Sequence, residues 1–269
     1  MSFISKKRPA NMPLFRRTAV ALGMLVACAS ASALPQFTLD PIAAGLAGAG
    51  FTGDNILISD YSTVTFDGLG NFTDTGFLSV SAIQLGGSTF TPAGLNSTYG
   101  LYFAFSGVGT TTIGDPRFDV TVATFSSLTY QLYGYNGPAS FGFSGNTPTE
   151  TASGEVLLAS GTLISGKAAT IPTGDGSTFT PSANAKLNFV VTPGQEAFFA
   201  DPNPFYNVAF AAFTNTTTQV EPFAGGFRIR QGGGAINFAT TPPIPEPETY
   251  ALMLAGLAAV GFVARRRRA

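Results

Sequence analysis

The chain has 269 residues, with 14 Lys and Arg, 15 Asp and Glu, one Cys, no His and no Trp. The lack of histidine excludes Ser-His and Cys-His nucleophile activation and most zinc sites, leaving carboxylate pairs, Lys or Tyr bases and oxygen-ligand metal sites. The formal charge of −1 hides an acidic middle: residues 34–241 hold five basic and 13 acidic side chains, a net of −8, which argues against nucleic-acid binding.

Residues 1–33 are predicted to be a secretory signal peptide. Five cations lie between Lys6 and Arg17, an apolar run follows from Ala19 to Ala29, and Ala31-Ser32-Ala33 is a small-residue cleavage pattern. The run is shorter than the about 20 residues that a membrane-spanning helix needs. We therefore expect signal peptidase to cut between Ala33 and Leu34.

A second interpretation of the leader stays open. Leu25-Val26-Ala27-Cys28 matches a bacterial lipobox, in which the cysteine is lipidated and becomes the first residue. If the cut instead follows Ala33, the only cysteine is removed and the mature chain contains no disulfide, although it is exported.

Residues 34–241 are predicted to form one all-β domain, an antiparallel β-sandwich or jelly-roll-like fold. A segment of this length can bury a single core. Runs of alternating apolar residues, separated by Gly, Pro, Asn, Asp and Ser, are typical of a sandwich or barrel with one buried and one wet face. Strands are expected at 55–66, 72–85, 99–105, 118–122, 128–135, 154–165, 187–191, 206–214, 227–231 and 235–239.

Other parts of the same segment are interpreted as connections. A short helix is expected at 41–49, and polar loops at 144–153 and 172–183. Gly232-Gly233-Gly234 lacks the strand–glycine–helix context of a phosphate loop and predicts a hairpin turn between the last two strands. Most of the 25 phenylalanines are expected in the core.

No pair of carboxylates is marked as catalytic by the sequence. A glycosidase needs two carboxyl groups close together, but the aspartates are widely spaced and are interpreted as solvated turn residues. Structural calcium stays open at Asp115 with Asp119 and at Asp54-Asn55 with Asp60, because calcium takes oxygen ligands. Otherwise no cofactor is expected. The aspartates considered are Asp54, Asp60, Asp67, Asp74, Asp115, Asp119, Asp175 and Asp201.

Tyr133 and Tyr135 fall on the expected wet face of their strand. With Gln131 and Asn136 they could form a flat platform for the apolar faces of sugar rings, which makes them candidate glycan contacts. The alternative is that another sheet or loop covers this face.

Residues 242–269 end the chain with three consecutive signals. Pro245-Glu246-Pro247 precedes an apolar segment at 249–264, which is expected to be a short hydrophobic helix, and Arg265, Arg266, Arg267 and Arg268 follow it. This order resembles the PEP-CTERM sorting signal, which implies transient anchoring in the inner membrane, with the arginines at the cytoplasmic face, and cleavage by exosortase near Pro-Glu-Pro. The alternative is a plain C-terminal membrane anchor.

Several body segments, together with this tail, resemble the family of flocculation-associated PEP-CTERM proteins. The segments are Leu34–Pro41, Asp54–Ile56 with Tyr61-Ser62, Tyr99–Tyr102, and Phe198–Pro202 with Pro204–Tyr206. The resemblance implies a secreted protein of Gram-negative bacteria that acts with exopolysaccharide in floc or biofilm formation, and it brings no catalytic residues. The sequence thus predicts a non-enzymatic matrix protein, with a carbohydrate-binding module or, less favoured, a glycan-active enzyme as alternatives.

Overall fold

The computed structural model describes residues 34–240. The expected signal peptide with Ala31, Ala33 and Cys28, and the tail with its Pro-Glu-Pro, hydrophobic helix and arginines, lie outside the described residues. Leu34, the expected first residue of the mature chain, is partly exposed.

The described part of the chain is built from strands and three short 3₁₀ helices, with no α-helix. None of its helices is long and apolar enough to cross a membrane. The elements are β1 (Phe37–Leu39), η1 (Pro41–Ala44), β2 (Phe51–Gly53), β3 (Asn55–Phe66), β4 (Asn71–Leu85), β5 (Ser88–Phe90), β6 (Tyr99–Thr111), β7 (Thr121–Asn136), β8 (Phe141–Ser144), β9 (Thr147–Glu150), β10 (Val156–Pro172), β11 (Phe179–Asn188), β12 (Val190–Val191), η2 (Glu196–Phe198), β13 (Phe199–Asp201), β14 (Val208–Thr214), η3 (Thr217–Gln219), β15 (Val220–Phe223) and β16 (Gly226–Ala239).

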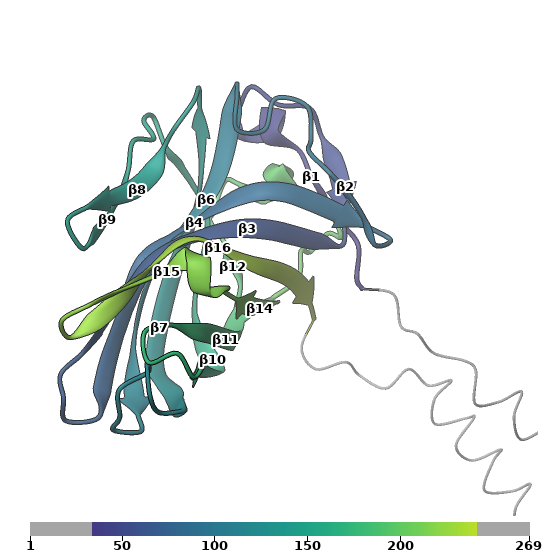
Figure 1. Cartoon of the computed structure of the whole chain (residues 1–269). Coiled ribbons are helices and arrows are strands. Elements are labelled where there is room, and N and C mark those ends of the chain that lie inside the picture. The colour runs from purple at the N-terminus through teal and green to yellow at the C-terminus, as the bar shows by residue number, and fades with distance from the viewer. Residues whose placement is uncertain (1–33, 241–269) are drawn as a thin grey trace, which may run out of the picture. The chain divides into compact units, whose positions relative to one another are not determined.

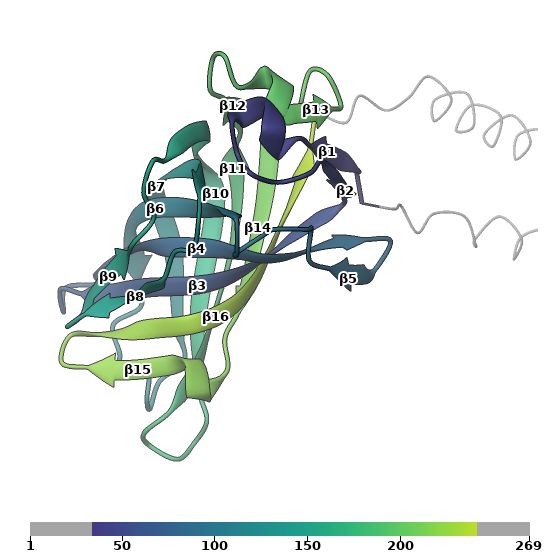
Figure 2. The ribbon, with the colours of Figure 1, turned by 90° about the horizontal axis from the view of Figure 1, so that it is seen from above.

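Eight of these strands form one antiparallel sheet that closes on itself (Figure 1 and Figure 2). Each long strand pairs with the next one along the chain, in the order β3, β4, β6, β7, β10, β11, β14 and β16. β16 pairs back with β3, which completes the ring. The expected all-β class is therefore confirmed, but the strands form a single up-and-down closed sheet rather than the two sheets of a sandwich or the crossed connections of a jelly roll.

Period-two alternation places the core inside the ring. On β7, Leu128, Tyr130 and Leu132 are buried, whereas Thr129 and Gln131 between them are exposed. Closure satisfies the backbone groups at both edges of the sheet, so none of the eight strands is left as a free edge along its full length.

One end of the ring is filled by aromatic side chains beneath the small sheet β13-β1-β2. Phe238, on the last strand, contacts Phe37 of β1 with ring centroids 5.3 Å apart and Phe189 at 5.0 Å. Phe199 of β13 packs on Phe205 at 4.7 Å. This cluster seals that end of the core.

Most of the predicted strands are present, and corrections are needed for one strand, one helix, two loops and one turn. The strand expected at 118–122 is wrong at its start, because residues 115–120 form a loop and β7 begins at Thr121. The alternating Phe118 and Val120 are exposed there rather than buried. The helix expected at 41–49 is only the 3₁₀ turn η1, capped by Asp40 and ended by Gly45 at φ 76°.

The polar stretches 144–153 and 172–183 are not plain loops, because the first contributes to the hairpin β8-β9 and the second enters β11 at Phe179. The hairpin turn predicted at Gly232–Gly234 is wrong as well. These glycines lie inside β16, which runs from Gly226 to Ala239 without a reversal. They serve close packing: a Cβ on Gly234 would lie 2.7 Å from the ring of Phe213, and one on Gly232 would lie 2.2 Å from the Asn215 side chain.

Candidate functional site

The two candidate tyrosines on β7 belong to an aromatic cluster on the outer face of the sheet. Tyr133 is half-buried and stacks on Tyr102 of β6, with ring centroids 5.3 Å apart and an interplanar angle of 23°. Tyr135 is only 1% exposed, and its ring lies over Gly100, where a Cβ would come within 2.1 Å of the tyrosine hydroxyl. The Tyr102 hydroxyl donates to Glu155 Oε1 at 2.7 Å.

The hairpin β8-β9 covers this cluster. Phe141 of β8 packs on Tyr102 at 5.5 Å and on Tyr61 of β3 at 5.9 Å between ring centroids. The Thr63 hydroxyl donates to the carbonyl of Asn146 at 2.6 Å, which fixes the hairpin tip to β3. The prediction of a wet face is therefore wrong at Tyr135, and the open alternative of a covered face holds there. Tyr133 keeps partial exposure, and glycan contact by it stays a prediction.

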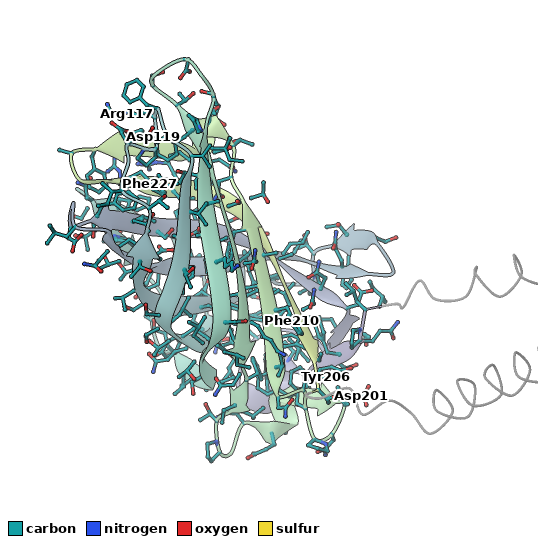
Figure 3. The ribbon with its side chains drawn as sticks, turned by 90° about the horizontal axis from the view of Figure 1, so that it is seen from below. Arg117, Asp119, Asp201, Tyr206, Phe210 and Phe227 are labelled. Atoms are coloured by element: carbon teal, nitrogen blue, oxygen red, sulfur yellow. The ribbon has the colours of Figure 1, made fainter. Side chains whose placement is uncertain are left out.

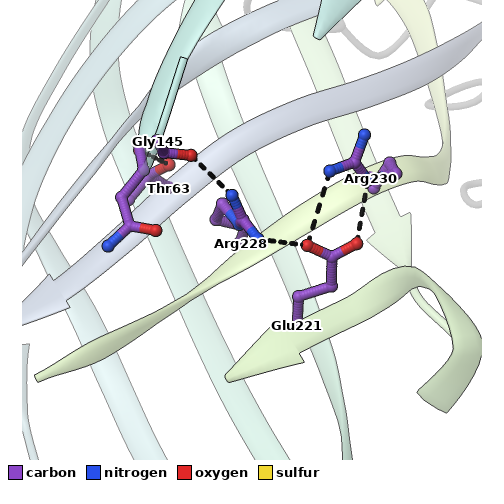
Figure 4. Close-up of polar contacts among 6 residues, drawn as sticks. Thr63, Gly145, Glu221, Arg228 and Arg230 are labelled. Carbon is purple, nitrogen blue, oxygen red and sulfur yellow. Dashed lines mark hydrogen bonds and ion pairs between the residues drawn. The ribbon is translucent and has the colours of Figure 1, made fainter. Parts of the chain in front are cut away.

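Charged groups fasten the same hairpin from the other side. Glu221 of β15 forms ion pairs with Arg228 and Arg230 of β16, and Arg228 also donates to the carbonyl of Gly145 (Figure 4). Both guanidinium groups lie over the ring of Phe143, at 5.4 and 5.3 Å from its centroid. The arginines lower the pKa of Glu221, chiefly through the hydrogen bond from Arg230. These contacts hold the hairpin β8-β9 over the aromatic cluster, which is a structural role.

A more open surface lies on the outer side of β7, β10, β11 and β14, here called the polar outer face. Its exposed or partly exposed side chains include hydroxyl, amide and lysine groups and one aromatic ring: Thr124, Thr129, Gln131, Thr162, Lys167, Asn184, Lys186 and Phe210. Three aliphatic side chains on β7 and β10 are exposed as well, namely Val122, Ile164 and Ile171. Thr124, Lys167 and Asn184 stand side by side across three strands. Phe210 is 38% exposed, and the Lys186 ammonium lies 5.6 Å from its ring centroid.

Phe210 was missed by sequence reasoning, which assigned the phenylalanines mostly to the core. The alternation of β14 carries the signal, because Ala209 and Ala211 are buried and Phe210 between them must point outward. Figure 3 shows Phe210 on the same end of the ring as Tyr206 and Asp201, with Arg117 and Asp119 at the opposite end. A face that combines hydroxyl, amide and apolar side chains with one exposed ring is suited to contact with a polysaccharide chain.

Three of the aspartates are turn residues, as predicted. Asp67 accepts hydrogen bonds from the backbone of Leu69 and Asn71, and Asp175 accepts them from Ser177 and Thr178, which lowers the pKa of both carboxyls. Asp115 forms an ion pair with Arg117 at 2.6 Å, so the Arg117 guanidinium supplies the positive charge next to this carboxylate.

Three aspartates, Asp54, Asp60 and Asp74, are buried rather than solvated and correct that interpretation. Asp60 on β3 and Asp74 on β4 point into the ring. Burial raises the pKa of Asp60 to about 7, opposed in part by the Ser62 hydroxyl, and burial with the nearby Asp60 charge raises the pKa of Asp74 well above its usual range. Asp54, by contrast, is engaged with the backbone amide of Gly86 at 2.6 Å. Among residues 34–240 no group of three or more His, Cys, Asp or Glu is placed to hold a metal ion.

Comparison with known families finds one match, outside the closed sheet. Residues 243–268 match the PEP-CTERM protein-sorting motif. No curated protein and no solved structure matches the chain. The motif indicates an exported, cell-surface-directed protein that exosortase processes, whereas the resemblance of the body to flocculation-associated proteins stays a prediction.

Proposed function

We propose that this chain, an exported protein with a PEP-CTERM sorting motif, is a non-enzymatic component of the extracellular matrix of a Gram-negative bacterium, where it associates with exopolysaccharide in flocs or biofilm. The observation that carries the proposal is the sorting motif at residues 243–268.

The polar outer face supports the exopolysaccharide part of the proposal. Hydroxyl and amide side chains on adjacent strands can exchange hydrogen bonds with many sugar hydroxyls, and Phe210 can stack on an apolar sugar face. Each such contact is weak, so retention in a matrix depends on many copies of the protein and many repeats of the polymer.

Intact-mass analysis of the protein recovered from the matrix of its native host tests the export route. We expect a species that begins at Leu34 and ends near Pro245–Pro247. Retention of Arg265–Arg268 would contradict exosortase processing and support a plain membrane anchor. A lipidated Cys28 at the N-terminus would contradict cleavage after Ala33.

A second measurement separates a general matrix role from a dedicated carbohydrate-binding module. In the module, Phe210→Ala or Tyr133→Ala abolishes co-sedimentation with purified exopolysaccharide, whereas Phe118→Ala, at the opposite end, leaves it unchanged. In the matrix protein that we propose, single substitutions weaken retention only a few-fold, because binding is distributed. Turnover of the polymer would instead support a glycan-active enzyme and contradict the proposal.

A further inference from the structure

A groove, here called the loop groove, opens at the end of the closed sheet that lies away from β13. It has a volume of about 610 Å³, and it is lined by the turn after β3, the loop before β7, the start of β11 and the turn between β15 and β16. Figure 3 shows Arg117 of that loop and Phe227 of β16 at this end, opposite Asp201. A groove of this volume lies in the range of about 300–1,000 Å³ in which proteins bind organic ligands.

Phenylalanine rings supply the apolar part of the loop groove. Phe179 and Phe227 are buried and pack edge to face, with ring centroids 5.0 Å apart. Half-buried Phe66 packs on Phe227 at 6.0 Å. Phe223 is half-buried too, and its ring lies over Gly226, where a Cβ would come within 2.9 Å of Phe223 Cζ. The partly exposed rings of Phe66 and Phe223 therefore form an apolar surface that its neighbours hold in place.

The loop before β7 adds a carboxylate and a guanidinium to the same groove. Arg117 Nη2 donates to Asp115 Oδ2 at 2.6 Å, and Arg117 Nε lies 3.0 and 3.1 Å from the two carboxylate oxygens. The backbone amides of Phe118 and Asp119 donate to the Asp115 carbonyl, which fixes the loop. The Asp115 and Arg117 side chains are 36% and 48% exposed. Because the pair uses Nε and Nη2, the Nη1 group of Arg117 is left to bond a ligand.

The charges around the loop groove disfavour an anionic ligand. The guanidinium of Arg117 is already balanced by Asp115. Asp119 adds a negative charge beside the pair, since its carboxylate accepts from the Asp115 backbone amide at 3.1 Å. Residues 34–241 also carry a net charge of −8. A neutral ligand with hydroxyl groups, by contrast, can bond to the pair without opposing this charge.

We propose that the loop groove binds neutral hexose units of a polysaccharide. The apolar C–H face of a sugar ring stacks on Phe66 or Phe223, and hydroxyl groups at its rim bond to Arg117 and to the edge of the Asp115 carboxylate. Aromatic rings beside a fixed polar pair match a ligand that has both an apolar face and a polar rim. This inference rests on the proposed function for the source of the sugar, and it adds a second contact surface to the polar outer face.

A tryptophan in the groove would report the sugar directly, because the chain contains no Trp. Phe223→Trp keeps an aromatic ring at the lining position, and Ala224→Trp puts the same reporter at an exposed position of the same turn. Phe210→Trp puts it on the polar outer face. Each variant is purified from the native host and titrated with neutral oligosaccharides of glucose, galactose, mannose or N-acetylglucosamine, and with oligogalacturonate as the acidic probe.

We expect a saturable change in tryptophan emission from a groove reporter with at least one neutral probe and none with the acidic probe. The second groove reporter keeps the test decisive if Phe223→Trp fails to fold. Silence of both groove reporters with every neutral probe would overturn the proposal. A response of Phe210→Trp alone would place the sugar on the polar outer face and overturn it as well, and binding of the acidic probe alone would contradict the charge argument.

Arg117→Gln tests the polar contacts by calorimetry with the neutral probe that binds. It removes the guanidinium donors, so we expect affinity to fall about tenfold or more. Phe118→Ala is the neighbouring control, because the Phe118 ring does not line the groove and lies against Gly176, where a Cβ would be 3.2 Å from it. This variant should bind like the parent chain. Unchanged affinity in Arg117→Gln would overturn the assigned contacts.

Co-sedimentation with exopolysaccharide separates this inference from the proposed function. If the polymer retains the parent chain but no neutral probe alters a groove reporter, the loop groove is wrong and the matrix role stands. If a neutral probe binds in the groove but the polymer does not retain the parent chain, the proposed function fails and the groove stands, with sugar from another source.

Discussion

The Asn215 amide oxygen fills the position that a Cβ would take on Gly232, 2.2 Å from the ideal atom. Gly232→Ala should therefore force Asn215 out of place and destabilise the fold by about 1–3 kcal/mol. Chemical denaturation measures the change. The neighbouring Gly233→Ala is the control, because its Cβ would approach nothing nearer than the Thr214 carbonyl, at 3.6 Å. Equal effects of the two substitutions would show that Asn215 moves without cost.

Stability should fall as the pH rises from 5 to 8. A carboxyl group whose folded pKa is about 7, against a usual value of 3.8, binds more protons in the folded state, so its stabilising contribution is complete below pH 4 and is lost as the pH rises through 7. The difference is on the order of a few kcal/mol for Asp60. Thermal unfolding at each pH gives the slope.

Asp60→Asn provides the control for that pH dependence. It removes the ionisation but keeps the shape of the side chain, so the fall in Tm between pH 5 and 8 should shrink markedly. Asp67→Asn removes a turn carboxyl with a lowered pKa, whose effect is confined to more acidic solutions, and should leave the slope intact. A parent chain that is more stable at pH 8 than at pH 5 would argue against protonated buried carboxyl groups.

Tyr133 and Tyr135 should differ strongly when each is replaced by Ala. Tyr135 is 1% exposed, so its truncation opens a cavity and should cost about 3 kcal/mol or more, whereas half-buried Tyr133 should cost about 1 kcal/mol. Urea denaturation separates them. A double substitution therefore confounds glycan binding with unfolding, and Tyr133→Ala alone is the informative variant. Similar losses at both positions would contradict the assigned burial.

The hairpin cover depends on Phe141. Phe141→Ala removes the ring that contacts Tyr61 and Tyr102, and we expect faster proteolysis within residues 138–152 with a loss of about 2 kcal/mol in stability. Phe118→Ala, at a ring that is 63% exposed, should change neither quantity. Unchanged cleavage in the Phe141 variant would mean that the arginine contacts and the Thr63 bond hold the hairpin by themselves.

Local alternation was enough to predict the strands but not how they close. The inward residues of β3 and β7 follow a period of two, so 55–66 and 128–135 could be recognised from the sequence. Whether consecutive strands form one ring or two sheets depends on long-range pairing, here that of β16 with β3, which no local pattern encodes.

The predictions from sequence were wrong at certain glycines, which were expected in a turn, and at certain aspartates, which were expected to be solvated. Three glycines in a row usually mark a turn, but Gly232 and Gly234 instead admit the Asn215 and Phe213 side chains from a neighbouring segment. Asp60 and Asp74 occupy inward positions of the same alternation that places Ile58 and Leu78. The alternation of inward and outward residues along each strand therefore indicated that both aspartates are buried. Their carboxyl groups, which usually face solvent, indicated the opposite.

The contact between Phe37 and Phe238 joins the first and last strands of the described fold, with ring centroids 5.3 Å apart. Whatever precedes β1 and whatever follows β16 is consequently attached at one pole of the body. A protein held through either terminus would present its opposite pole, where Leu69, Ile113 and Phe118 are exposed, to its surroundings in the same orientation. Tethering through the N-terminal end alone or through the C-terminal end alone would therefore expose the same opposite pole.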